Sequence, residues 1–179
     1  MAGLATSFGS GAMTNSIGEI QDAACLLVIG SNTTEAHPII GLQVRKAVRQ
    51  KGAKLIVANP KEIDLCRLAD VWLRLRPGTG VALLNGLAHV ILRDGLHDPV
   101  FIEERTEGFA AWREVVQKYT PELTSKVTGV PAEEIVRAAW LYATGGEATG
   151  DGETRRQGDG ETLPLPRGGG RGEGLRERN

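Results

Sequence analysis

The sequence predicts an α/β fold in which a parallel sheet has helices on both of its faces. Two apolar runs, Cys25–Gly30 and Lys54–Ala58, have the continuous hydrophobicity of strands that are buried on both sides. Between them, Pro38–Gln50 places its apolar side chains mostly on one helical face. A strand, a helix and a second strand at this short spacing favour a right-handed parallel crossover.

Composition and charge argue against several classes of function. The chain has 179 residues and a formal net charge of −1, which gives no electrostatic reason to expect a nucleic-acid partner. No run of about 18 apolar residues is present, so we expect no membrane span and no signal peptide. Cys25 and Cys66 fall in a predicted strand and a predicted helix. We therefore expect buried thiols rather than a disulfide or a zinc or iron–sulfur site.

The segment before the first strand is predicted to contain one short helix. Residues 1–13 are small, uncharged and rich in glycine, which is typical of interior sequence rather than of a free terminus. Thr14 or Asn15 can cap a helix that continues to Asp22.

A third strand is predicted over Val71–Leu75, with Arg74 and Arg76 pointing outwards at alternate positions. An apolar helix over residues 81–93 follows it and contains His89. No second ligand-type residue stands one helical turn from this histidine. A hydrogen-bonded core histidine is therefore favoured over a catalytic or metal-binding one.

Short amphipathic helices are predicted for most of the remaining folded part. We interpret Trp112, Val115, Val116 and Tyr119 in this part as packing residues. The last helix has its cap and acidic first turn within Thr128–Glu134. One short helix is expected between the second and third strands, over residues 62–69. After the apolar helix, we expect helices over residues 99–105 and 109–118, a short helix opened by Thr120, and a final helix that runs to about Ala143.

The composition changes abruptly after Thr144. Residues 145–179 contain no aromatic residue and are rich in Gly, Arg and Glu, so they bury too little apolar surface to offset the entropy of ordering. We therefore predict a folded part over residues 1–144 and a disordered tail over residues 145–179. A phosphate-binding or RNA-binding glycine-rich tail is the less favoured alternative, because acidic residues balance the arginines and no aromatics interleave.

Three loops follow the three predicted strands, at the edge where open α/β sheets bind ligands. In the first, Gly30 permits close approach of the backbone, and Ser, Asn and Thr residues come next. Pro38 suits the first turn of a helix, whose N-terminus offers N–H groups and a positive dipole to a phosphate. The other loops are Asn59–Glu62 and Pro77–Gly80. Tight turns without a ligand are the alternative, and the glycine fingerprint of NAD-binding proteins is absent.

Together with their flanks, these loops resemble the molybdopterin oxidoreductase family, most closely the catalytic alpha subunit of formate dehydrogenases. The resemblance extends over residues 2–144 and implies a Rossmann-like domain that is part of a larger multidomain molybdoenzyme. The motifs that carry it are Ala12–Ile20, Val28–Pro38, Lys54–Pro60, Arg76–Thr79 and Glu104–Phe109.

The resemblance implies a molybdopterin guanine dinucleotide carrying molybdenum or tungsten. The first loop would wrap the dinucleotide, the second would lie by the guanosine, and the third would complete the nucleotide pocket. In this family Asp commonly stands at the position of Gly80, so guanine selectivity here would need Asn59 or Glu62 as a substitute. The implied cofactor-binding residues are Gly30, Ser31, Asn32, Thr33, Thr34, Glu35, His37, Asn59, Pro60, Lys61, Glu62, Pro77, Gly78, Thr79 and Gly80.

The resemblance further implies an internal fragment. Family members have a molybdenum-ligating Cys or selenocysteine, an N-terminal four-iron four-sulfur cluster and a second dinucleotide-binding region, which find no counterpart in these motifs. We therefore expect no catalytic residue and no metal ligand here, and we interpret the tail after Thr144 as sequence read out of frame.

The full-length parent would oxidise formate to carbon dioxide in the cytoplasm and pass electrons to iron–sulfur or NAD-linked subunits. Two alternatives stay open. One is a non-catalytic relative such as the large iron–sulfur subunit of respiratory complex I, and the other is a nitrate-reducing molybdoenzyme.

Overall fold

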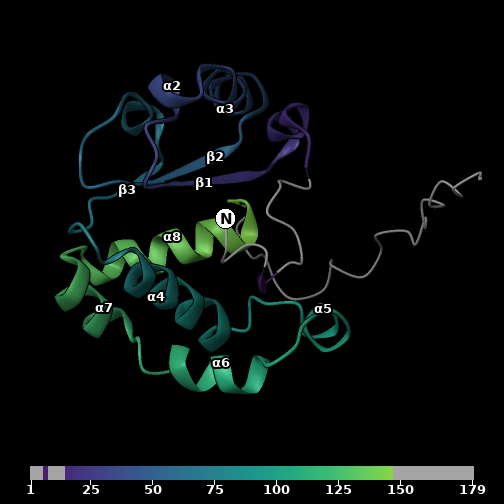
Figure 1. The fold of residues 1–179 in the computed structure, drawn as a ribbon, viewed down its shortest axis with the longest axis vertical. Helices are drawn as coiled ribbons and strands as arrows, with labels where there is room; N and C mark the ends of the chain where they lie inside the picture. Colours follow the sequence, from purple (N-terminus) through teal and green to yellow (C-terminus); the bar gives the residue numbers. More distant parts are fainter. Residues whose placement is uncertain (1–5, 8–14, 147–179) are drawn as a thin grey trace, which may run out of the picture. The chain divides into compact units, whose positions relative to one another are not determined.

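The computed structural model describes residues 6–7 and 15–146. They form three layers, with a three-stranded sheet in the middle and helices on each face (Figure 1). The strands are parallel and lie in the order β1-β2-β3. The predicted α/β fold is confirmed. The strands are β1 (Cys25–Ile29), β2 (Lys54–Ala58) and β3 (Val71–Leu73).

The register aligns the ends of the three strands. Ile29 pairs with Ala58, and Ala58 pairs with Leu73. One residue further on, the Gly30 N–H donates to Ala58 O at 3.0 Å, and the Asn59 N–H donates to Leu73 O at 3.2 Å. We call this end of the sheet the carboxyl edge, and the end where the strands begin the amino edge. The first two predicted loops therefore start side by side at the carboxyl edge.

One face of the sheet is covered by the elements that connect its strands. Val44 of the long connecting helix packs there with Leu55 and Val57 of β2. Leu55 and Val57 alternate along β2 with Ile56 and Ala58, which belong to the core on the opposite face. The elements on this side are η1 (Ile17–Asp22), α2 (Thr33–Ala36), α3 (Pro38–Lys51) and η2 (Asp64–Leu68).

The other face is covered by helices that follow β3. Two of them approach closely at Gly86, where a Cβ atom would lie 2.6 Å from the Thr124 side chain. The helices are α4 (Gly80–Arg93), α7 (Pro121–Thr128) and α8 (Ala132–Thr144). The core on this side contains Ile56, Ala58, Val71, Leu73, Leu83, Leu87, Val90 and Ile135.

Two short helices, α5 (Pro99–Arg105) and α6 (Phe109–Val116), follow α4. The prediction of packing residues here was partly wrong. Val116 is buried, but 43% of Trp112 and 47% of Val115 are exposed. Only one stripe of this short helix faces α4, and the Trp112 ring packs instead against Phe109 of its own helix. His89 Nδ1 lies 3.2 Å from Val116 O, which confirms the predicted hydrogen bond, although His89 is half-buried rather than a core residue.

Several predicted boundaries and helix types were wrong. Both η1 and η2 are short 3₁₀ helices next to strands rather than α-helices, and 3₁₀ structure is frequent in such connecting segments. The third strand ends at Leu73, because the Leu75 N–H turns back to Leu73 O and the Arg76 N–H leaves the sheet for Thr128 O. The last helix ends at Thr144, one residue later than predicted, and α6 ends two residues earlier than predicted.

The expected burial of β1 was also wrong. Every residue of β1 is half-buried, although β3, the other border strand of the sheet, buries Val71 and Leu73. Cys25 and Cys66 are free thiols but only partly buried. Burial, aided by the charge of Asp70, raises the pKa of the Cys25 thiol, which therefore stays protonated at neutral pH.

Of the predicted tail, only Gly145 and Gly146 fall within the described residues. Both have positive φ, 68° and 85°, and a Cβ on Gly146 would lie 2.8 Å from the Lys54 side chain. The other tail residues, for which disorder was predicted, lie outside the described residues. So does the small-residue segment 1–13, apart from residues 6–7. Within the described residues, no helix is long and apolar enough to cross a bilayer.

Candidate functional site

The first predicted loop leaves β1 at Gly30, whose φ of 62° is in the left-handed region that favours glycine. The chain then forms a four-residue helix, α2, where a loop was expected. Asn32 starts this helix because its carbonyl accepts the N–H groups of Glu35 and Ala36 at 3.1 and 2.9 Å. The prediction of a loop between β1 and α3 was therefore wrong over Thr33–Ala36, and α2 and α3 meet at His37.

The hydroxyl groups of this segment differ in accessibility. Thr33 is only 6% exposed, and its Oγ1 lies 3.4 Å from Ser31 Oγ. Thr34 Oγ1 is buried and has no hydrogen-bond partner within the described residues. Glu35 and His37 are exposed at the surface. The side chains that a ligand can reach in this conformation thus include those of Glu35 and His37 and the partly exposed Ser31 and Asn32.

The second loop has a closely fixed backbone. Asn59 is 8% exposed, and its side-chain Oδ1 accepts the Lys61 N–H at 3.0 Å. This bond is an Asx-type turn, in which a side-chain amide closes the turn two residues on. Pro60, Lys61 and Glu62 are exposed. The loop therefore presents a cationic and an anionic side chain from a rigid base.

Two residues of the third strand region hold the second loop. The Trp72 Nε1–H donates to Asn59 O at 3.0 Å, and the Arg74 Nε–H donates to Pro60 O at 3.4 Å. The Arg74 guanidinium lies over the Trp72 ring, 5.5 Å from its centroid. Alternation along the strand correctly predicted that Arg74 points outwards, but local spacing does not predict this contact with the second loop. The alternation of N–H-bearing side chains at the end of the strand was the available signal.

The third loop is tied to α7 rather than to the other loops. Arg76 Nη1 donates to Lys126 O at 2.9 Å, at the C-terminal end of α7. Thr79 Oγ1 donates to Arg76 O at 2.7 Å, so this hydroxyl closes the turn. Gly78 has φ of 82°, and Gly80 begins α4 with open space around the position of a Cβ. Pro77 and Gly78 are exposed.

Two long helices begin at these loops without a local cap. No side-chain hydrogen bond within the described residues caps α3 or α4, and neither has an acidic residue in its first turn. Asp98 caps α5, Thr120 caps α7, and two glutamates occupy the first turn of α8, whereas the short helix α6 also starts without a side-chain cap or an acidic first turn. The first turns of α3 and α4 thus offer N–H groups and positive dipole ends to an anion.

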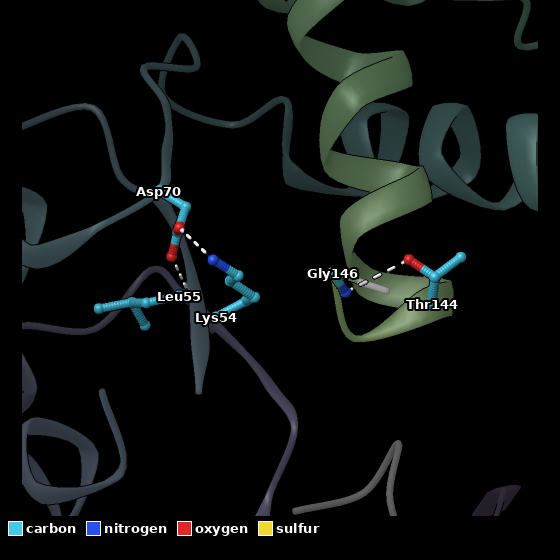
Figure 2. A network of polar contacts seen from close by, with 5 residues as sticks. All are labelled: Lys54, Leu55, Asp70, Thr144 and Gly146. Carbon is cyan, nitrogen blue, oxygen red and sulfur yellow. Dashed lines mark hydrogen bonds and ion pairs between the residues drawn. The ribbon is translucent and has the colours of Figure 1, made fainter. Parts of the chain in front are cut away.

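The amino edge differs in that its polar groups are paired with one another. The Asp70 carboxylate accepts the Leu55 N–H at 2.9 Å and lies 3.3 Å from Lys54 Nζ (Figure 2). The Asp70 N–H donates to Leu55 O at 2.8 Å. Beyond the end of α8, the Gly146 N–H donates to Thr144 Oγ1 at 3.3 Å (Figure 2).

The structure thus brings the first two predicted loops directly together and places the third beyond them, beside α7. The arrangement combines exposed glycine backbone, two uncapped helix N-termini and side chains of both charges. This combination suits a ligand with phosphate groups and a polar ring. The described residues contain no cluster of three or more His, Cys, Asp or Glu that would hold a metal ion.

Comparisons with known proteins give relatives for this arrangement. Residues 3–155 match the family model described as molybdopterin oxidoreductase. The chain is 45% identical over 149 residues to the F420-dependent formate dehydrogenase subunit alpha of Methanocaldococcus jannaschii, covering 83% of this chain and 22% of that relative. It is 45% identical over 143 residues to formate dehydrogenase H of Escherichia coli, covering 80% and 20%.

Among solved structures, acetylene hydratase from Pelobacter acetylenicus aligns with a TM-score of 0.60 and 30% identity, over 73% of this chain and 19% of that one. The chain therefore spans about a fifth of the length of these relatives.

Proposed function

Because this chain belongs to the molybdopterin oxidoreductase family, we propose that its carboxyl edge binds the guanosine diphosphate part of a molybdopterin guanine dinucleotide. Two features of the edge support the proposal. The helices α3 and α4 both start there without a cap or an acidic first turn, and the loops that precede them contain exposed glycines. A dinucleotide presents the diphosphate that such helix ends favour.

The proposed roles follow the order of the loops. Residues 30–37 lie against the dinucleotide, residues 59–62 lie by the guanosine, and residues 77–80 complete the pocket at the start of α4. In the first loop, Gly30 backbone and the exposed Glu35 and His37 are available. The bound group would supply two-electron chemistry at a molybdenum or tungsten ion, and this chain's residues supply binding and orientation.

Guanine selectivity is the part of the proposal on which the structure bears most directly. Asn59 is only 8% exposed, and one of the two lone pairs of its Oδ1 already accepts the Lys61 N–H, so this oxygen is a less accessible acceptor than the exposed Glu62 carboxylate. Gly80 contributes no side chain. The exposed Glu62 carboxylate is therefore the acceptor that we assign to the guanine N1–H and amino group.

For the longer protein we propose oxidation of formate to carbon dioxide. The support is the 45% identity to two formate dehydrogenases. The proposal for the longer protein includes a bis-molybdopterin form of the cofactor, an upstream four-iron four-sulfur cluster, electron-transfer partner subunits and a cytoplasmic location. It also includes a domain boundary after Thr144, with the tail beyond it read out of frame.

A structural role without a cofactor is the second candidate, and the missing side chain at Gly80 favours it.

The presence of bound pterin distinguishes the two candidates. We would purify the chain without oxygen, both alone and extended by its upstream genomic sequence, and assay each for bound pterin by the fluorescence of the oxidised pterin. The proposal expects pterin in the extended protein, with formate-dependent dye reduction. Pterin in neither form would contradict it and favour the structural role.

A further inference from the structure

The backbone of the second loop is held by hydrogen bonds from two side chains at the end of β3 and from one side chain of the loop itself. Three consecutive backbone groups are engaged: Asn59 O by Trp72, Pro60 O by Arg74, and the Lys61 N–H by the Asn59 side chain. The Asn59 N–H is also paired, with Leu73 O. The backbone of residues 59–61 is therefore held in place by these hydrogen bonds.

Trp72 and Arg74 act as one unit, because the guanidinium of Arg74 lies over the Trp72 ring. Stacking restricts the rotamers of both side chains, so the two N–H donors are presented at fixed positions. The indole also packs on its apolar side against the core that contains Val57 and Leu65. The position of the loop is thus coupled to the sheet rather than to solvent.

We propose that Trp72 and Arg74 are positioning residues that hold residues 59–62 in the conformation that binds the nucleotide. This inference rests on the proposed function. Neither side chain needs to touch the ligand: their effect is to keep the backbone of residues 59–61, and with it the Asn59 side chain, in one position. Binding then costs less loss of conformational entropy, since the loop is already ordered.

The chain contains a matched control for Trp72. Trp140 is also partly buried, and its Nε1–H donates to Asp94 Oδ2 at 2.7 Å, between α8 and the end of α4. Trp72→Phe and Trp140→Phe each remove one indole hydrogen bond and keep an aromatic ring. Only the first removes a bond to the second loop. Arg74→Met, at an exposed position, provides a second variant that removes the other donor without disturbing the core.

Two measurements on the full 179-residue chain test the proposal. Amide hydrogen exchange of the ligand-free chain reports opening of the turn at Lys61, and titration with GDP reports affinity, both at a temperature where circular dichroism shows each variant to be folded. We expect Trp72→Phe and Arg74→Met to accelerate Lys61 exchange and to weaken GDP binding, each by about three- to tenfold. We expect Trp140→Phe to change neither.

The proposal is overturned if Trp72→Phe and Arg74→Met leave Lys61 exchange or GDP affinity at the wild-type value, or if Trp140→Phe changes them equally. Failure of the wild-type chain to bind GDP overturns the proposed function instead. The exchange measurement requires no ligand, so in that case it still decides whether the two side chains hold the loop.

Discussion

The two ends of the sheet use polar residues in opposite ways. At the amino edge, Asp70 is paired with Lys54 and with the Leu55 N–H, and the end of α8 is closed by Thr144 (Figure 2). At the carboxyl edge, Glu35, His37, Lys61 and Glu62 are exposed, and two helices start without a cap.

This difference separates residues that stabilise the fold from residues that are available to a ligand. A charge that is paired within the chain contributes to folding and is costly to remove. A charge or helix end that is unpaired contributes little to folding, and a ligand can use it. We therefore expect substitutions at the amino edge to change the free energy of unfolding, and substitutions at the carboxyl edge to change ligand affinity.

The largest effect on stability is expected for Asp70→Ala. Leu55 is fully buried, and its N–H would lose its acceptor. We expect the free energy of unfolding in urea to fall by about 1–3 kcal/mol, with GDP affinity of the folded chain unchanged. Asp70→Asn, which keeps an acceptor oxygen, is the control and should lose less. Equal losses in both variants would contradict the assigned hydrogen bond.

Two glycines, one at each edge, provide the next comparison. Gly146→Ala places a Cβ at φ of 85° against the Lys54 side chain, so we expect a loss of about 1–2 kcal/mol in unfolding free energy. Gly80→Asp meets open space and adds an acid at the start of α4, so we expect a gain of about 0.3–1 kcal/mol. Thermal unfolding of both variants measures the difference; destabilisation by Gly80→Asp would show that this helix end is already compensated.

A pair of lysines tests the same contrast with smaller effects. Lys54→Ala removes the partly exposed partner of Asp70 and should cost about 0.2–1 kcal/mol of stability. Lys61→Ala should leave the unfolding free energy within about 0.5 kcal/mol, but weaken GDP binding about two- to fivefold, less so at high salt. A matching loss of GDP affinity in Lys54→Ala would contradict the assignment of the site to the carboxyl edge.

The smallest effect concerns pH. Hydrogen bonds from Arg93 hold the pKa of the Asp94 carboxyl below its usual value, with a further contribution from Trp140. A carboxyl with a lowered folded pKa stabilises the protein above its unfolded pKa of about 3.9, and this contribution is lost as pH falls through the folded value.

Asp94→Asn should therefore reduce stability by about 0.5 kcal/mol near pH 7, and the difference from wild type should shrink below about pH 4. Unfolding in urea at both pH values measures it. A difference that does not depend on pH would show that the charge of Asp94 is not responsible.

Sequence patterns were sufficient for the parallel sheet and its main helices. The apolar runs predicted both β1 and β2 with bounds close to the observed ones, and in β2 the continuous hydrophobicity corresponds to the observed burial. The half-burial of β1 was not predictable, since strand order depends on tertiary packing and not on local composition. Burial of α6 was not predictable for the same reason: periodicity predicts which face of the helix is apolar, but not how much of that face another element covers.

At the candidate site, the sequence located the three loops but not what holds them. A residue pattern shows that Gly30 and Asn59 follow strands, and parallel pairing then places them together. The contacts of Trp72 with Asn59 and of Arg76 with α7 join segments that are distant along the chain. Such contacts depend on side-chain geometry, which local spacing does not specify.

The proposal that the carboxyl edge is the nucleotide site is tested most directly by NMR of the ¹⁵N-labelled chain, which maps the residues that respond to GDP. We expect chemical-shift changes for the amides of residues 30–37, 59–62 and 78–82, and none for Lys54, Leu55, Asp70 or Thr144. Shift changes centred on the amino edge, or none at millimolar GDP, would contradict the assignment of the carboxyl edge as the nucleotide site.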